Sequence, residues 1–135
     1  MVPKIFIDTN IIIDFLDQRM FELNKTNLLF KLVEDNNVTG FVSESVITNA
    51  IYITGLEERI LKLLHIISVV CIEKDTIKNA MKSNFKDKED GILYYGALDK
   101  KIDYFITRNK KDFIKHSLKQ LPVLSPKELI SRIYN

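Results

Sequence analysis

The chain has 135 residues, of which 46% are hydrophobic and 28% are charged, and its formal net charge is +2. This size predicts a single domain with a real hydrophobic core, and the composition is ordinary for a globular protein. No run approaches the ~18 apolar residues of a membrane span, no export signal opens the chain, and the lone Cys71 excludes an internal disulfide, so we expect a cytoplasmic protein without a membrane partner.

Short apolar runs that are typical of buried strands alternate with longer segments in which apolar residues recur at helical spacing. Such alternation is the pattern of an α/β domain with a parallel sheet. The predicted strands cover residues 4–7, 38–42, 68–72, 104–107 and 122–124.

Helices are predicted in the gaps between these strands. They begin after Asp8-Thr9-Asn10, cover 24–34, 46–53, 56–66 and 90–100, start near Asp75, and follow Ser125. Ser43 or Ser45 can cap the helix after the second strand, and Asp75 can cap the helix that it precedes. Ser125-Pro126-Lys127-Glu128 is a capping-box start for the last helix.

Acidic residues follow the ends of three predicted elements. Asp8 ends the first strand, Asp90 begins a helix, and Asn109 with Asp112 follows the strand at 104–107. Right-handed crossovers bring the carboxyl ends of parallel strands to one edge of the sheet, where such sheets bind ligands. Two separated histidines and one cysteine do not suit zinc, whereas oxygen ligands from several turns suit Mg²⁺ or Mn²⁺. The pattern predicts a divalent-metal site, where an activated water attacks phosphorus.

Each acidic cluster also has a structural interpretation. Asp8 can be no more than a helix cap. Glu89 and Asp90 can interact favourably with a helix dipole without any metal, and Asp112 can cap a short helix or pair with a lysine. The joint occurrence at one sheet edge favours the metal site.

Three further expectations concern residues outside these clusters. Asp14 and Asp17 are expected to face solvent from the first helix, and Cys71 to be a small buried hydrophobe. His65 and His116 lack a partner at catalytic spacing and receive no general-base role.

The charge is unevenly distributed. Residues 1–67 carry 6 Lys or Arg against 9 Asp or Glu, and residues 68–135 carry 14 against 9. A basic half that holds two of the acidic clusters suits a polyanion met through bound cations, although a solvated lysine-rich surface gives the same count. The cations nearest to the clusters are Lys82, Lys86, Lys88, Arg108, Lys110, Lys111, Lys115 and Lys119.

Three segments together resemble the signature of PIN-domain proteins. They are Phe6-Ile7-Asp8-Thr9-Asn10, then Glu89-Asp90 with Ala97-Leu98 and Asp103, then Ile106-Thr107-Arg108-Asn109-Lys110-Lys111-Asp112-Phe113. The resemblance implies a three-layer α/β/α sandwich with a central, mostly parallel four- to five-stranded sheet, as one PIN-like domain over 1–135. Many relatives are Mg²⁺- or Mn²⁺-dependent ribonucleases, and many small ones are toxins of toxin–antitoxin pairs.

By the same resemblance, Asp8 and Asp90 would be metal-binding carboxylates. Asn109 takes the place of a further carboxylate, with Asp112 the nearest acid, and Thr107 and Asn10 would orient the site by hydrogen bonding.

Asn49 stands where relatives usually carry a glutamate. Glu44 lies about one helical turn earlier, where it can either substitute for that glutamate or serve the N-terminus of the helix. Glu89 supports the site beside Asp90, and Arg108, Lys110 and Lys111 would bind RNA.

The leading hypothesis is therefore a metal-dependent endoribonuclease and toxin, with RNA, a cognate antitoxin and a second copy in a homodimer as partners. The second is a catalytically degenerate PIN domain that binds RNA or protein, since Asn49 and Asn109 replace carboxylates. The third, a phosphotransferase with Asp8 as nucleophile, ranks last because Asn10 occupies the place of the usual second aspartate.

Overall fold

The computed structural model describes residues 1–19 and 22–134, and its centre is a parallel sheet. The strand order is β3-β2-β1-β4-β5, and every neighbouring pair is parallel. The strands are β1 (Lys4–Ile7), β2 (Thr39–Ser43), β3 (Ser68–Val70), β4 (Tyr104–Ile106) and β5 (Val123–Leu124). The chain moves outward from β1 in one direction through β2 and β3, and then in the other through β4 and β5. The switch point, where ligands bind in such sheets, therefore lies between β1 and β4.

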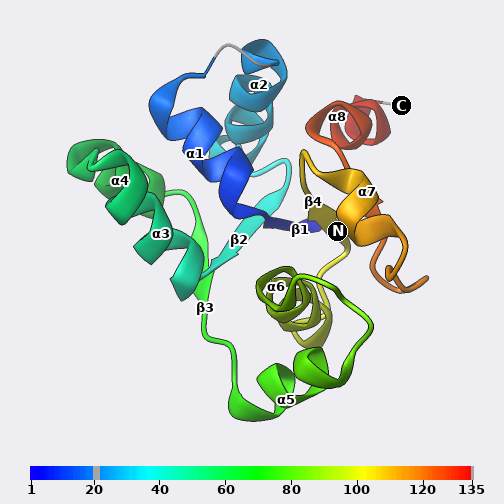
Figure 1. Ribbon diagram of the computed structural model, residues 1–135. Helices are drawn as coiled ribbons and strands as arrows, with labels where there is room; N and C mark the ends of the chain where they lie inside the picture. Colours follow the sequence, from blue (N-terminus) through cyan, green and yellow to red (C-terminus); the bar gives the residue numbers. More distant parts are fainter. Residues whose placement is uncertain (20–21, 135) are drawn as a thin grey trace.

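Helices cover both faces of this sheet. They are α1 (Thr9–Asp17), α2 (Leu23–Glu34), α3 (Glu44–Thr54), α4 (Glu57–Leu64), α5 (Lys74–Lys82), α6 (Lys88–Asp99), α7 (Lys110–Ile114) and α8 (Pro126–Tyr134). Figure 1 shows α1 and α2 on one side of the strands and α5 and α6 on the other. The predicted α/β/α sandwich with a parallel sheet is confirmed. No helix in the described ranges has both the length and the apolar character needed to cross a bilayer.

The core explains why β1 lies at the middle of the sheet. Ile5, Phe6 and Ile7 are all fully buried, and the Phe6 ring stacks on Phe105 of β4 with centroids 5.5 Å apart. A strand covered on both faces carries a continuous apolar run rather than an alternating one. The first polar side chain after that run, Asp8, therefore marks the end of the strand.

Local capping signals agree with the structure at two predicted helix starts. The Ser43 hydroxyl accepts a hydrogen bond from the Val46 amide at 3.4 Å, at the start of α3. At α8, the Ser125 hydroxyl accepts from the Glu128 amide, and the Glu128 carboxylate accepts from the Ser125 amide. This reciprocal pair is the predicted capping box.

Three expectations are wrong. Cys71 is exposed, because the edge strand β3 ends at Val70 and leaves the cysteine in the following loop. Asp75 does not cap α5, because the helix begins at Lys74 with Glu73 as its N-cap residue. Asp14 does not face solvent: it is 1% exposed, because α1 is covered almost all round.

Candidate functional site

Asp8 lies where β1 ends and α1 begins, and it is only 4% exposed. Its Oδ1 accepts a hydrogen bond from the Thr9 amide at 2.8 Å, and its Oδ2 accepts one from the Thr107 hydroxyl at 2.8 Å. Burial raises the pKa of Asp8, while the bonds from Thr107 and Thr9 act in the opposite direction by stabilising the carboxylate.

Thr107 connects the two strands that flank the switch point. It is fully buried just after β4, donates its hydroxyl to Asp8 and accepts a hydrogen bond from the Asn109 amide at 3.0 Å. The Asp8 amide in turn donates to the Ile106 carbonyl at 2.9 Å. Asp8 is therefore oriented by a segment from the other half of the chain.

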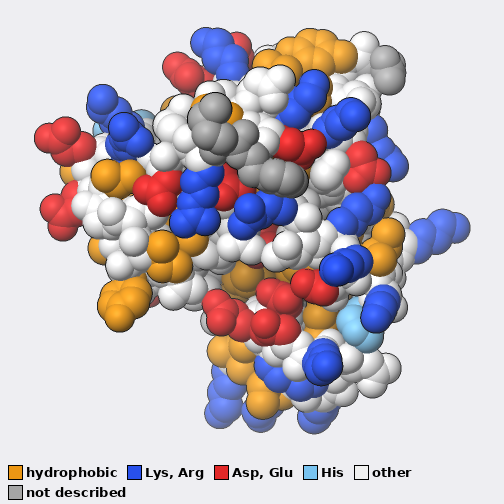
Figure 2. Space-filling view, turned by 45° about the horizontal axis from the view of Figure 1, so that its top comes forward, with side chains coloured by type: hydrophobic (Ala, Val, Ile, Leu, Met, Phe, Trp, Pro, Cys, Tyr) orange, Lys and Arg blue, Asp and Glu red, His pale blue; other side chains and the backbone are white. Residues whose placement is uncertain are grey.

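Asp90 lies in the first turn of α6, and several acidic side chains lie near it. Burial raises its pKa to about 7, with further contributions from the charges of Asp87, Asp8, Asp112 and Glu89. Repulsion from these like charges therefore adds to a shift whose main cause is burial. Figure 2 shows acidic side chains gathered on this face of the molecule, with Lys and Arg side chains beside them.

A cavity of about 250 Å³ opens at this acidic group. Its lining residues come from the start of α6 and from α7 and its C-terminal end, and they are Lys86, Asp87, Asp90, Lys111, Asp112, Lys115 and His116. Two predicted carboxylates, Asp90 and Asp112, thus share one cavity, and Asp8 lies near enough to act on the pKa of Asp90.

Asn49 joins α3 to the same region. Its side-chain amide donates to the Glu89 carboxylate at 3.2 Å. Glu44 is exposed and lines a neighbouring cavity of about 390 Å³ together with Asn49. Asp90 and Asp112 line a different cavity, so Glu44 does not share theirs.

The other predicted residues lie around the same edge. Asn109 is exposed as the N-cap residue of α7, and Asn10 is half-buried in the first turn of α1. Lys111 lines the acidic cavity. Lys110, by contrast, binds both carboxylate oxygens of Glu128 at 2.8 and 2.7 Å, which joins the start of α7 to α8.

Two residues that line the acidic cavity, Asp87 and His116, were not predicted from the sequence as site residues. Asp87 is the N-cap of α6, where its Oδ1 accepts from the amides of Glu89 and Asp90, and it contributes more than any other charge to the raised pKa of Asp90. The N-cap preference for aspartate was the available signal. His116 lines the acidic cavity and packs on the Phe85 ring with centroids 4.8 Å apart, and no local pattern indicates that position.

The donor set around Asp8 and Asp90 fits a hard divalent cation. Within residues 1–19 and 22–134, no three His, Cys, Asp or Glu side chains already converge closely enough to share an ion. Mg²⁺, however, commonly keeps several waters and takes only one or two carboxylates directly. A cation bound there would offset the repulsion from the neighbouring acids, which adds to the effect of burial on the pKa of Asp90.

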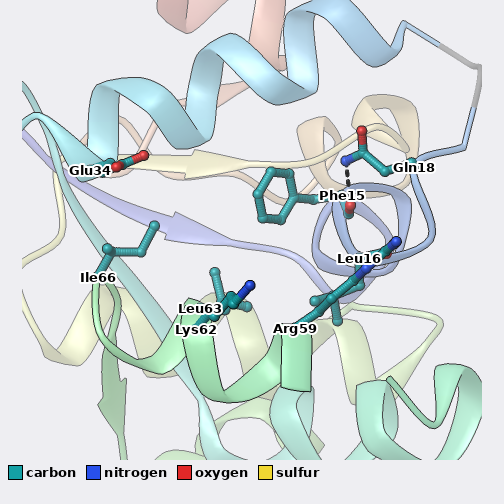
Figure 3. Close-up of a pocket in the computed structure, with 8 residues that line it drawn as sticks. All are labelled: Phe15, Leu16, Gln18, Glu34, Arg59, Lys62, Leu63 and Ile66. Atoms are coloured by element: carbon teal, nitrogen blue, oxygen red, sulfur yellow. Dashed lines mark hydrogen bonds between the residues drawn. The ribbon is translucent and has the colours of Figure 1, made fainter. Parts of the chain in front are cut away.

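A larger cavity of about 530 Å³ lies away from these acids, between α1, the end of α2 and α4. Figure 3 shows its lining side chains, Phe15, Leu16, Gln18, Glu34, Arg59, Lys62, Leu63 and Ile66, with the hydrogen bond from Gln18 to the Phe15 carbonyl dashed. None of the carboxylates around Asp90 lines it. Size alone therefore does not identify the chemical site in this fold.

Comparison with known proteins agrees with this architecture. A family model described as "PIN domain" matches residues 4–111. No curated protein sequence gives a significant match.

Three solved structures share the fold. A toxin–antitoxin complex from Klebsiella pneumoniae has 21% identity and a TM-score of 0.66, with 90% of this chain and 96% of that chain covered. VapBC2 from Rickettsia felis, bound to a DNA fragment from its promoter, has 14% identity and a TM-score of 0.64, with 90% and 98% covered. VapC20 of Mycobacterium tuberculosis, a toxin that cleaves the sarcin–ricin loop, has 10% identity and a TM-score of 0.63, with 85% and 97% covered.

Proposed function

The chain belongs to the PIN-domain family, and we propose that it is an Mg²⁺- or Mn²⁺-dependent endoribonuclease that hydrolyses RNA phosphodiester bonds. The observation that carries this proposal is the group of carboxylates around Asp90 at the switch point of the sheet, with a pKa raised to about 7. Membership of a family that includes toxin-like nucleases supports it, as does the loop-cleaving activity of the M. tuberculosis relative.

Asp8, Asp90 and Asp112 are the carboxylates that we propose for the cation, with one or two of them bound directly and the others through water. When bound, a divalent ion there supplies a Lewis acid that activates water and screens the charge of the phosphate. The Thr107 hydroxyl and the Thr9 amide keep the Asp8 carboxylate oriented and favour its ionised form. The Asn49 side-chain amide donates a hydrogen bond to the exposed Glu89 carboxylate, so Glu89 adds charge beside Asp90 without having to be a direct ligand.

Basic residues of the same cavity would bind the RNA backbone. Lys86, Lys111 and Lys115 line it together with the acids, so a phosphate that approaches the carboxylates also meets ammonium groups. Arg108 and Lys111 are the RNA contacts that we propose from the signature segment. Lys110 is paired with Glu128, and an RNA contact there would have to share its ammonium with that carboxylate.

We further propose a toxin role, with a cognate antitoxin as protein partner and action on RNA in the cytoplasm. Two of the similar structures are toxin–antitoxin assemblies, which supports such a partner. Self-association as a homodimer is part of the same proposal, and sedimentation of the purified chain tests it.

The test is cleavage of a single-stranded RNA by purified protein with and without Mn²⁺, compared with the variant Asp8→Asn. Asparagine also caps helices well, and its one side-chain oxygen can accept from either the Thr9 amide or the Thr107 hydroxyl, so the fold should survive. We expect cleavage to fall by at least about 1,000-fold, equivalent to about 4 kcal/mol of barrier. The matched control is Asp17→Asn, a change of the same kind on α1. An Asp8→Asn variant as active as the wild type contradicts the proposal.

A second candidate function, a binding module without catalysis, is favoured by one specific contact. Asn49 is neutral, so it adds no negative charge to the site. It also donates a hydrogen bond to Glu89, which occupies part of the hydrogen-bonding capacity of that carboxylate. Calorimetric titration with Mn²⁺ separates the two candidates. A nuclease site binds Mn²⁺ in an Asp8-dependent manner, and a degenerate site does not.

A further inference from the structure

Asp14 is a buried carboxylate that the proposed mechanism does not use. It is 1% exposed on α1, and its Oδ2 lies 3.5 Å from Nε of Arg108. Its Oδ1 lies 3.9 Å from Nη1 of Arg19. A carboxylate withdrawn from water is costly unless it is paired, so this burial requires a partner cation.

Arg108 is the principal partner of the two. Its contact with Asp14 is shorter, and its side chain is 30% exposed, whereas Arg19 is 45% exposed and also approaches Asp17 at 3.5 Å. The pKa of Asp14 is raised by burial, and the charge of Arg108 opposes that rise more than the charge of Arg19 does. Asp14 is thus paired more closely with Arg108, which follows β4, than with Arg19 at the end of its own helix.

This ion pair places Arg108 beside the acidic site. Arg108 directly follows Thr107, whose hydroxyl holds Asp8, and the charge of Arg108 lowers the pKa of Asp8. The guanidinium is planar, carries five N–H donors, and binds phosphate in a fork geometry. The Asp14 carboxylate makes an ionic contact on the Nε side of the guanidinium, while 30% of the side chain remains accessible.

We propose that Asp14 is a substrate-positioning residue that holds Arg108 at the mouth of the Asp8 site, where the guanidinium binds an RNA phosphate next to the cleaved bond. The inference rests on the proposed ribonuclease function and adds to it the residue that orients the phosphate contact. Asp14 itself does not touch the substrate, because its side chain is almost fully buried.

The experiment is a double-mutant cycle on RNA binding, measured without cleavage. In an Asp8→Asn background, fluorescence anisotropy gives the dissociation constant of a labelled single-stranded oligoribonucleotide for the Asp14→Asn, Arg108→Gln and double variants. We expect each single change to weaken binding by about tenfold, the size of one charge-assisted hydrogen bond, and the double variant to bind no more weakly than Arg108→Gln alone.

Asp17→Asn and Arg19→Gln are the matched controls. They alter charges of the same helix and its end but not the pair with Arg108, so both should bind the oligonucleotide as the background does. In the cleaving protein, Asp14→Asn should raise KM with little change in kcat, because the carboxylates around Asp90 are untouched.

Two results overturn the proposal. One is an Asp14→Asn variant that binds the oligonucleotide as the background does, and the other is an Asp14→Asn loss that is as large with Gln at residue 108 as with Arg. If Asp14→Asn fails to fold, Arg108→Lys carries the test, since it keeps the charge but removes the Nε contact. In the same Asp8→Asn background, an Arg108→Lys variant that binds the oligonucleotide with unchanged affinity then overturns the proposal. Failure of the nuclease function would instead appear as absent Mn²⁺-dependent cleavage by the wild type, with the binding cycle still readable.

Discussion

Asp14 and Asp90 are both carboxylates whose pKa is raised by burial, but the protein surrounds them with opposite charges. Asp14 lies on α1 between two guanidinium groups, Arg108 at 3.5 Å and Arg19 at 3.9 Å. Asp90 lies on α6 among four acids, and its pKa reaches about 7. One carboxylate is paired with cations inside the fold, whereas the other lies among like charges in a cavity that lysines also line.

The difference separates a structural acid from a candidate functional one. Removing the acid from a buried ion pair destabilises the fold, because its partner loses the charge that faced it. A group of like charges costs stability and is retained where it serves another purpose, so perturbed carboxylates in a cavity are functional-site candidates. Variants at the two positions should therefore have opposite effects on stability and unequal effects on activity.

Among variants of Asp14 and Asp90, the largest expected effect is the loss of activity on changing Asp90. Asp90→Asn removes a proposed cation ligand, and we expect RNA cleavage to fall at least about 100-fold, equivalent to about 2.7 kcal/mol of barrier. Initial rates over an Mn²⁺ titration measure it. Asp99→Asn, at the other end of α6 and hydrogen-bonded to Thr76, is the control that should retain the wild-type rate. If Asp90→Asn cleaves RNA at the wild-type rate, Asp90 is not a ligand of the catalytic cation.

The next effect is on stability at Asp14. Asp14→Ala leaves Arg108 without this partner, and we expect a loss of about 2 kcal/mol, less than a fully buried pair would lose because Arg108 is 30% exposed. Urea unfolding of the metal-free protein measures it. Asp17→Ala, which disturbs only a contact to the exposed Arg19, should cost no more than about 0.5 kcal/mol. Equal losses for the two variants contradict the distinction.

The smallest effect concerns the pH dependence at Asp90. Its pKa is raised from 3.8 to about 7 in the folded chain, so between these values the folded state binds more protons than the unfolded state. Stability from this group therefore falls as the pH rises through that window, and its full cost is present above pH 7.

Asp90→Asn should consequently stabilise the metal-free protein at pH 8, by about 1 kcal/mol after allowance for solvent screening, and have little effect near pH 4. Thermal unfolding at both pH values measures the difference. Added Mn²⁺ should raise the Tm of the wild type at pH 8 and not that of the variant. Parallel pH profiles for the two proteins contradict the interpretation.

Features that depend on neighbouring residues in the chain could be predicted well. The apolar run before Asp8 predicted β1 with its observed bounds, and the Ser125-Pro126-Lys127-Glu128 start predicted α8, because strand burial and helix capping are read from consecutive residues. The end of β3 was predicted less well, since an edge strand ends where its pairing stops, and pairing is set by β2.

The charged residues show the same division. From the sequence, Asp14 and Asp17 look alike, because both are acids on one short amphipathic helix. Burial of Asp14 depends on Arg108, which approaches from the loop after β4. The group around Asp90 likewise draws on β1, α6 and α7, so its pKa could not be inferred from any one segment.

The sequence by itself determined the α/β class, the family, the switch-point carboxylate Asp8 and the starts of α3 and α8, because these follow from hydrophobic periodicity, capping and short motifs. The tertiary structure alone decided which acids are compensated and which repel one another. The reason is physical: the charge state of a carboxylate depends on burial and on charges within a few ångströms, and those neighbours come from distant parts of the chain.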